Sequence, residues 1–512
     1  MLTQNEVKIK INELIAYAID NLSLKSDDQY FVLNLLLDLF KLDAPGDPIS
    51  KYGDFQKDIV DPLVEYAVSI GLTTKEECLL FETKLLNYVT PTPSAVVEKF
   101  DIIAANKTIQ DATDWMFNLS KNCNYIRMCD INKNIMWDHK GKFGPLKITI
   151  NLSKPEKDPK AIALAKLQPQ TAYPKCMLCL ENIGFAGNLN KPARQTLRTI
   201  PIELNNEPWH LQYSPYQYYD QHVIAFADEH RPMKVTSESF RRLLDFVDLF
   251  PHYFIGSNAA LPIVGGSILT HDHYQGGNKV LPMFKVDTRK RYESADYKDA
   301  QVYIVNWYNS VVRVESENKE SALSLASEIL NKWNNYTDET VGIYCKTDEQ
   351  HNTVTPIARK ENGKYIIDMI LRNNRTDEAH PYGIFHAAEH LHNIKKEGIG
   401  IIEVMGLFIL PGRLKKEFEL MTAYLTGKKD FKQDIPELTK EDNPLSKHFN
   451  MLAQLINDND SALTSARANT AIRNYVNKAC EEILECTAVF KNDKKGQEAF
   501  EKFMKEGLGL TD

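Results

Sequence analysis

The sequence lacks any long apolar run. Its most apolar stretch, Ile399 to Pro411, covers only 13 residues and contains Glu403, whereas a transmembrane helix needs about 20 consecutive apolar residues. The first residues, MLTQNEVKIKINEL, also lack the apolar core of a signal peptide. We therefore expect a cytoplasmic protein with no membrane-spanning segment.

The sequence also has fewer basic than acidic residues. Lys and Arg number 61 against 69 Asp and Glu, which gives a net charge of -8. This balance argues against a nucleic-acid partner, although a local group of cations still suffices to hold a small phosphate. No Walker motif is present, and the short Gly141-Lys-Phe-Gly144 run is not a phosphate loop.

Cysteine is sparse, with 8 residues scattered over 512 except for the pair Cys176 and Cys179. Such usage is typical of a reducing compartment. Two thiolates separated by two residues can bind one tetrahedral metal ion. The alternative is two reduced cysteines in a turn, and the spacing by itself leaves both interpretations open.

The pattern of apolar residues changes near residue 120. Before it, apolar residues recur at helical spacing, as in Val7, Ile11, Leu14 and Ile15. After it, short strand-like segments predominate, among them Trp209 to Tyr219 paired with Gln221 to Ala227. The length of 512 residues predicts three or four structural units. We expect an α+β protein that begins with a mainly helical domain.

The richest polar motif is His271-Asp272-His273-Tyr274-Gln275, with glycines on both sides. If Ile268 to Gln275 is extended, alternate residues share one face, so His271, His273 and Gln275 project together. Three polar side chains in a row are costly in a core, but they make sense lining a site. The alternative is a pair of core or metal-binding histidines.

This motif suits phosphoryl or nucleotidyl transfer. A neutral imidazole is a competent nucleophile when its second ring nitrogen is held by an acceptor. Gln275 can donate a hydrogen bond to a phosphate oxygen, where negative charge develops. A neutral amide cannot protonate a leaving group, which favours a leaving group that is already a stable phosphate.

Several blocks of sequence resemble the second, bacterial class of galactose-1-phosphate uridylyltransferases (UDP-glucose–hexose-1-phosphate uridylyltransferases), in the histidine-triad superfamily. The blocks are SNAALPIVGGSILTHDHYQGG, YPKCMLCLENIGFAGNLNKPARQ, ADEHRPMKV, HPYGIFHAAEHLHNIKKEGIGIIEVMG and ITINLSKPEKDPK. The resemblance covers the chain in order from about residue 120 to the C-terminus, and it extends to the helical N-terminus. The resemblance therefore extends well beyond a short motif.

The resemblance implies a ping-pong reaction of the Leloir pathway of galactose metabolism. UDP-glucose would donate UMP to His273, and galactose 1-phosphate would then take it to give UDP-galactose. Gln275 and His271 complete the implied catalytic set. Implied substrate contacts are Asn258, Gly266 and Ser267. Arg231 is a fourth candidate substrate contact, chosen for its place beside His230 and not for the resemblance.

The resemblance also implies a zinc site, although no cofactor is required with certainty. Its ligands would be Cys176, Cys179, His230 and His271, and its role structural. No nucleic-acid or membrane partner is expected, and a homodimer is compatible with the family. Other readings are a dinucleotide phosphorylase, a nucleotide hydrolase or a non-catalytic UDP-sugar-binding protein.

The implied fold is α+β, with antiparallel histidine-triad-like sheets and flanking helices after the helical N-terminal domain. Its parts are a helical N-terminal domain, a catalytic histidine-triad-like domain, a second such domain and a helical C-terminal segment, at residues 1–120, 121–300, 301–430 and 431–512.

Two further groups of residues are candidates for a site. His386, His390 and His392 either bind a metal, with His386 and His390 on one helical face, or bind substrate, or are polar loop residues. Six arginines are candidate phosphate contacts because a guanidinium can hold two phosphate oxygens. These are Arg194, Arg198, Arg231, Arg372, Arg375 and Arg413, with Arg231 favoured for its place beside His230.

Overall fold

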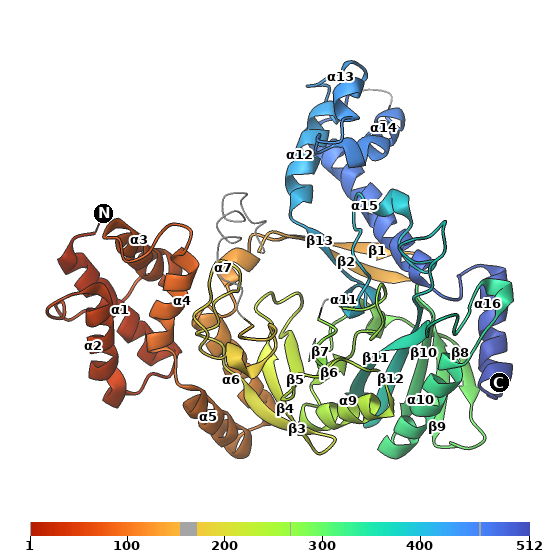
Figure 1. Ribbon diagram of the computed structural model, residues 1–512, viewed down its shortest axis with the longest axis horizontal. Coiled ribbons are helices and arrows are strands. Elements are labelled where there is room, and N and C mark those ends of the chain that lie inside the picture. The colour runs from red at the N-terminus through yellow and green to blue at the C-terminus, as the bar shows by residue number, and fades with distance from the viewer. Residues whose placement is uncertain (1, 154–171, 267, 460–461) are drawn as a thin grey trace. The chain divides into compact units, whose positions relative to one another are not determined.

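The computed structural model describes residues 2–153, 172–266, 268–459 and 462–512 (Figure 1). The chain divides into two compact units. The first comprises the described residues of 1–132 and 157–231, and the second those of 133–156 and 232–512. Both contain helices and antiparallel strands, so the α+β class is confirmed. The finer division into four parts stays a prediction.

The first unit begins with helices, as expected. Thr3 and Glu6 form a reciprocal capping box at the start of α1, and the predicted apolar face, including Val7, Ile11 and Leu14, is fully buried. The helices of this unit are α1 (Gln4–Asn21), α2 (Gln29–Phe40), α3 (Asp61–Ser69), α4 (Cys78–Val89), α5 (Pro93–Asn106), α6 (Ile109–Asn122) and α7 (Met128–Ile131).

Three antiparallel strands follow in the same unit, namely β3 (Ile200–Leu204), β4 (Glu207–Tyr213) and β5 (Val223–Ala227). The predicted pairing of the last two is confirmed, although β4 ends at Tyr213. The Tyr213 hydroxyl donates to the carbonyl of Thr113 in α6 at 2.7 Å. Its ring also packs on Phe117, with centroids 5.0 Å apart. Helix α6 therefore covers this sheet.

The second unit contains a larger antiparallel sheet, with strand order β7-β6-β11-β12-β10-β9-β8. Its strands are β6 (Tyr253–Gly256), β7 (His273–Asn278), β8 (Thr288–Glu293), β9 (Ala300–Val305), β10 (Val311–Ser316), β11 (Asn352–Glu361) and β12 (Lys364–Asn373). Strand β11 is buried over its first eight residues, so both faces of the sheet are covered.

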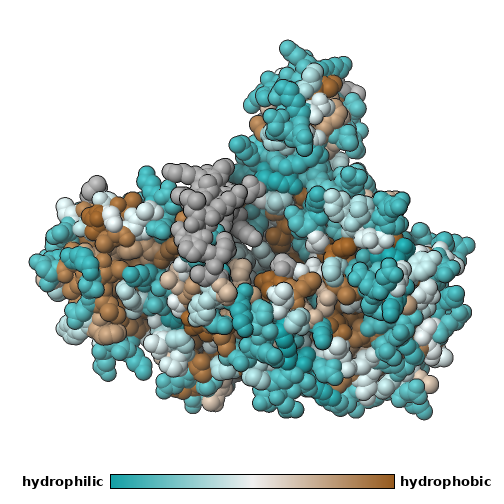
Figure 2. Space-filling view, in the orientation of Figure 1, coloured by the Kyte–Doolittle hydropathy of each residue, from teal (hydrophilic) through white to brown (hydrophobic). Residues whose placement is uncertain are grey.

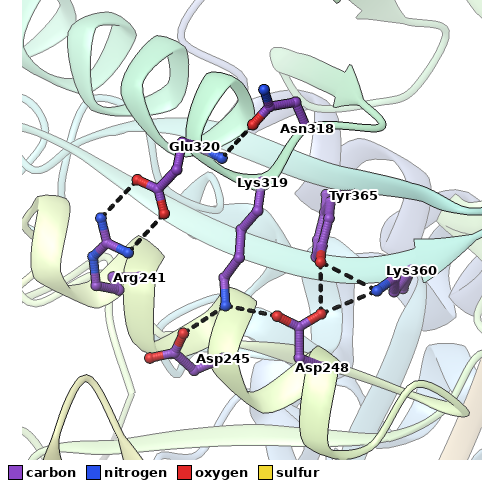
Figure 3. Close-up of polar contacts among 8 residues, drawn as sticks. All are labelled: Arg241, Asp245, Asp248, Asn318, Lys319, Glu320, Lys360 and Tyr365. Carbon is purple, nitrogen blue, oxygen red and sulfur yellow. Dashed lines mark hydrogen bonds and ion pairs between the residues drawn. The ribbon is translucent and has the colours of Figure 1, made fainter.

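Helices α9 (Ser237–Leu249) and α10 (Lys319–Asn334) lie side by side along this sheet (Figure 1). Polar contacts join their exposed sides (Figure 3). Lys319 Nζ lies 2.7 Å from Asp245 and 2.6 Å from Asp248. Arg241 donates two hydrogen bonds to Glu320, both 2.9 Å long. Bidentate, networked pairs of this kind hold two helices in register better than isolated surface pairs do.

The opposite face of the sheet carries buried charge. Asp368 in β12 is fully buried and accepts from Arg313 Nε at 2.6 Å and from Arg359 Nη1 at 2.5 Å. Burial opposes ionisation of this carboxyl, but the two guanidinium groups hold its pKa below the ordinary value. The three side chains therefore form one ionised network beneath the sheet.

A smaller sheet completes the second unit. Strands β1 (Ile135–Gly141) and β2 (Gly144–Asn151) form a hairpin, and β13 (Leu407–Pro411) pairs parallel to β2. Short helix α11 (Ile401–Val404) precedes β13. The remaining helices are α12 (Arg413–Leu425), α13 (Phe431–Leu438), α14 (Phe449–Asn457), α15 (Ser465–Thr487) and α16 (Lys494–Lys502).

Figure 2 shows a mainly hydrophilic surface over α12 to α14. Across the described parts of the chain, no helix combines the length and the apolar character that crossing a membrane requires.

Replacing Asp368 by Asn should destabilise the second unit strongly. The amide would leave the buried Arg313 without a counter-charge and Arg359 with only the partly exposed Glu361, which costs about 3–5 kcal/mol. The free energy of unfolding in urea measures this. Glu361→Gln is the matched control, because Glu361 pairs with the same Arg359 at a site that is 37% exposed, where about 0–1 kcal/mol is expected. Equal losses for the two variants would contradict the argument.

Candidate functional site

The polar motif lies at the start of β7, but only part of it is strand. The strand begins at His273, and a turn occupies the residues before it. The expectation of an extended chain from Ile268 is therefore wrong for its first five residues. The carbonyl of Leu269 accepts from the Met233 N–H at 2.9 Å, so this stretch is bonded to another loop and does not continue the β6–β7 ladder.

His273 is 5% exposed, and its ring is held by the turn. Nδ1 of His273 lies 2.8 Å from the backbone carbonyl of His271. A carbonyl oxygen only accepts hydrogen bonds, so Nδ1 must carry the proton. The lone pair is then on Nε2. Burial lowers the pKa of His273 to about 4, which keeps the ring neutral.

Gln275 shares the face of His273, two residues along the same strand. It pairs with Gly256 of β6 and is half-buried. Tyr274 points to the other face, where Ser239 and Arg242 of α9 act on its hydroxyl. The predicted alternation is thus confirmed from His273 onward. A site on the Gln275 face is separated by the sheet from the helical layer.

Gly276, directly after the motif, packs closely against the neighbouring strand. A Cβ at Gly276 would lie 2.2 Å from the carbonyl oxygen of Phe254 in β6. Gly276 lets β6 and β7 approach closely.

Asn258 lies just beyond β6 and is 4% exposed. Its side-chain oxygen accepts from the backbone N–H of Ile401 at 2.9 Å, at the start of α11. A Cβ at Gly266 would come within 2.5 Å of the Asn258 amide nitrogen. Two of the predicted substrate contacts, Asn258 and Gly266, are thus neighbours. Ser267 lies outside the described residues.

Cys176, Cys179 and His230 come together in the first unit. The two sulfur atoms are 3.5 Å apart, and Cys179 Sγ lies 3.1 Å from Nδ1 of His230. Asn182 donates from its amide to the carbonyls of both cysteines at 2.8 Å. Two sulfurs and one imidazole form a donor set that suits zinc, and the orienting Asn182 was missed at the level of sequence.

Arg231 follows His230 and is half-buried. Its guanidinium is paired with the carboxylate of Glu207 and lies over the ring of Trp209, 5.9 Å from the centroid. The predicted phosphate contact is therefore engaged by a protein carboxylate.

Comparison with known proteins gives two family matches. The model for the N-terminal domain of galactose-1-phosphate uridyl transferase matches residues 59–232, and the model for the C-terminal domain matches residues 246–437. The galactose-1-phosphate uridylyltransferase of Clostridium acetobutylicum is 47% identical over 97% of this chain and 99% of its own. This chain belongs to the galactose-1-phosphate uridylyltransferase family.

Two other relatives of the same name also match this chain over nearly its full length. The protein of that name from Caldanaerobacter subterraneus subsp. tengcongensis is 45% identical, with 98% of each chain covered. The one from Bacillus subtilis is 41% identical, with 96% of each covered. Among solved structures, yeast Ap4A phosphorylase Apa2 superposes with a TM-score of 0.30 at 11% identity, over 66% of this chain and 92% of its own. This score is too low to support an argument.

The second histidine group, His386, His390 and His392, does not lie on one face of a helix. His386 lies in a loop and His390 in a single 3-10 turn, so the predicted shared helical face is wrong. His390 pairs with Glu482 at 2.8 Å, whereas His392 is bonded to the carbonyl of Ala387 at 3.0 Å. Within the described ranges, the only group of three or more potential metal ligands is the one that contains the cysteine pair.

Gly276→Ala should disrupt the strand that presents His273. The new methyl group meets a backbone oxygen that cannot rotate away, and overpacking of this kind costs about 1–3 kcal/mol. A lower melting temperature and a loss of uridylyl transfer are expected. Val280→Ala, at a 55% exposed position just after the strand, is the control. Wild-type behaviour of both variants would show that the close approach is not needed.

Proposed function

We propose that this chain transfers a uridylyl group from UDP-glucose to galactose 1-phosphate, with His273 as the nucleophile. The supporting observation is the 2.8 Å contact between His273 Nδ1 and the His271 carbonyl. It fixes the proton on one nitrogen and leaves the lone pair on the other. Family membership supports the choice of substrates.

The reaction proceeds in two displacements. The Nε2 lone pair of His273 forms a bond to the α-phosphorus of UDP-glucose, and the bond from that phosphorus to glucose 1-phosphate breaks. A phosphate oxygen of galactose 1-phosphate then attacks the same phosphorus and displaces Nε2, giving UDP-galactose. Both leaving groups depart without a proton donor, since one is a stable phosphate anion and the other an imidazole.

Gln275 has the role of stabilising negative charge. It lies on the same strand face as His273, and its amide N–H can donate to a non-bridging oxygen of the transferring phosphate. Asn258, Gly266 and Ser267 are proposed to approach the uridine and the phosphate. Arg231 is proposed as a further phosphate contact, which requires its pairing with Glu207 to open.

A structural zinc ion is proposed at Cys176, Cys179 and His230, with His271 as the fourth ligand. Support comes from the sulfur and nitrogen atoms already gathered in the first unit, together with the full burial of His271. When bound, the ion would fix the position of the His271 backbone. The carbonyl of His271 would then hold the His273 ring in one orientation. A cytoplasmic location and a homodimer stay predictions.

Incubation with UDP-glucose and no acceptor should add one uridylyl group to the intact protein. Mass spectrometry detects the adduct, which galactose 1-phosphate should remove. His273→Ala should show no adduct and lose essentially all exchange activity. A wild-type protein that exchanges substrates without ever forming the adduct would overturn the covalent mechanism. Release of free UMP would favour a hydrolase, turnover of diadenosine polyphosphates a phosphorylase, and UDP-sugar binding without turnover a binding protein.

Elemental analysis of purified protein should find about one zinc per chain, because a site with two thiolates binds this ion tightly. Cys176→Ser should lose most of the metal and melt at a lower temperature. Cys78→Ser is the control, since Cys78 is a half-buried cysteine of the same unit outside the cluster. A fully active protein free of metal would reject the site.

A further inference from the structure

Arg372 lies near the end of β12, on the same sheet face as His273. The cross-strand pairs Gln275–Gly256, Gly256–Ile357 and Ile357–Asp368 connect the four strands on that face. Alternation then places His273 and Arg372 on it as well. Both residues lie toward the same end of their strands.

The guanidinium of Arg372 is buried but poorly satisfied. Its side chain is 1% exposed, and Nη2 donates to the carbonyl of Ile399 at 2.8 Å. Nε and Nη1 have no hydrogen-bond partner among the described residues. Leaving these N–H groups unpaired costs free energy of folding, because buried guanidinium hydrogens normally meet an acceptor. Burial lowers the pKa of Arg372 to about 10, so the group is still charged at neutral pH.

The nearest carboxylate does not balance this charge. Glu403 acts on Arg372 electrostatically, but its Oε1 pairs with the buried Lys395 at 3.1 Å. Its Oε2 accepts from the backbone N–H of Gly400 at 3.1 Å. Lys395 also lies 4.0 Å from the exposed carboxylate of Glu397, whereas Nε and Nη1 of Arg372 have no partner among the described residues. The Arg372 guanidinium therefore calls for an anion that is not part of this cluster.

Thr355 of β11 adds a second unsatisfied group on the same face. It is fully buried, and its hydroxyl has no partner among the residues that the structure describes. Thr355 pairs with Ile370 of the neighbouring strand β12. Its strand, β11, lies between the strands that carry His273 and Arg372. Its hydroxyl can donate to a phosphate oxygen.

The spacing fits two linked phosphates. His273 and Arg372 are three strand intervals apart, which is about 14 Å between backbones. Both side chains project from the same sheet face, and the long side chain of Arg372 can span part of that gap. A phosphorus bonded to His273 and a second phosphate beyond it would occupy the remainder.

We infer that Arg372, helped by Thr355, binds the phosphate of the hexose 1-phosphate, which is also the β-phosphate of the UDP-sugar. The inference rests on the proposed function and deepens it. UMP carries only the phosphate next to His273, so its binding does not use Arg372. The Arg372 guanidinium therefore makes the site selective for substrates that carry a second phosphate.

Titration calorimetry with galactose 1-phosphate and, separately, with UMP tests this assignment. Arg372→Met keeps the length of the side chain and removes its charge. It should weaken galactose 1-phosphate binding about 10- to 100-fold, the loss typical of a charge-assisted contact, and leave UMP binding unchanged. Arg372→Lys should lie between wild type and Met, because it keeps the charge but not the fork of donors.

Arg375 was a candidate phosphate contact by sequence, but its guanidinium is bonded to the Gly342 carbonyl at 2.9 Å and stacks on Tyr344. We therefore assign it no substrate contact, and Arg375→Met is the matched control. Wild-type affinity for both ligands is expected. Equal weakening of both ligands in Arg372→Met, or no weakening of either, overturns the assignment, as does a Lys variant weaker than Met. Adduct formation on wild-type His273 is scored separately, so failure of the uridylyl mechanism is distinguishable from failure of Arg372.

Discussion

The hydrogen bond between Nδ1 of His273 and the carbonyl of His271 determines which ring nitrogen carries the proton and which keeps its lone pair. It depends on a turn that ends directly before β7, since an extended chain would direct that carbonyl into the ladder. Ring orientation, the protonated nitrogen and access to Nε2 therefore all follow from the backbone over three residues. A metal held by the His271 side chain would act through the same backbone.

The large sheet of the second unit separates the face that packs against helices from the face that carries the proposed site. One face packs against α9 and α10, where Lys319 joins the two helices through Asp245 and Asp248 (Figure 3). The other face carries His273 and Gln275 at one end and the ionised Asp368 network further along. Asp368 pairs with both Arg313 and Arg359, whereas Nε and Nη1 of Arg372 have no partner among the described residues. An unmatched buried charge is a cost that a folded protein tolerates where a ligand offsets it.

The sequence pattern predicted the α+β class, the helical start of the chain and the alternation of His273 with Gln275. It could not locate the turn before His273, because the Leu269 carbonyl is bonded to a loop more than 30 residues earlier. The helical face proposed for the second histidine group was wrong because spacing alone does not distinguish a helix from a loop with one 3-10 turn. Arg372 was one of six candidate arginines, and only cross-strand register and burial distinguish it from the rest.

The parallel pairing of β2 with β13 joins Asn151 to Pro411, positions about 260 residues apart in the chain. At a synthesis rate of about 5–20 residues per second, the β1–β2 hairpin waits roughly 13–50 s on the ribosome for its partner strand. Throughout that interval β2 presents an open edge, and open edges recruit other strands. Folding in the cell is thus ordered by translation: the first unit can close early, whereas the sheet that holds the hairpin is completed only when the C-terminal part of the chain emerges.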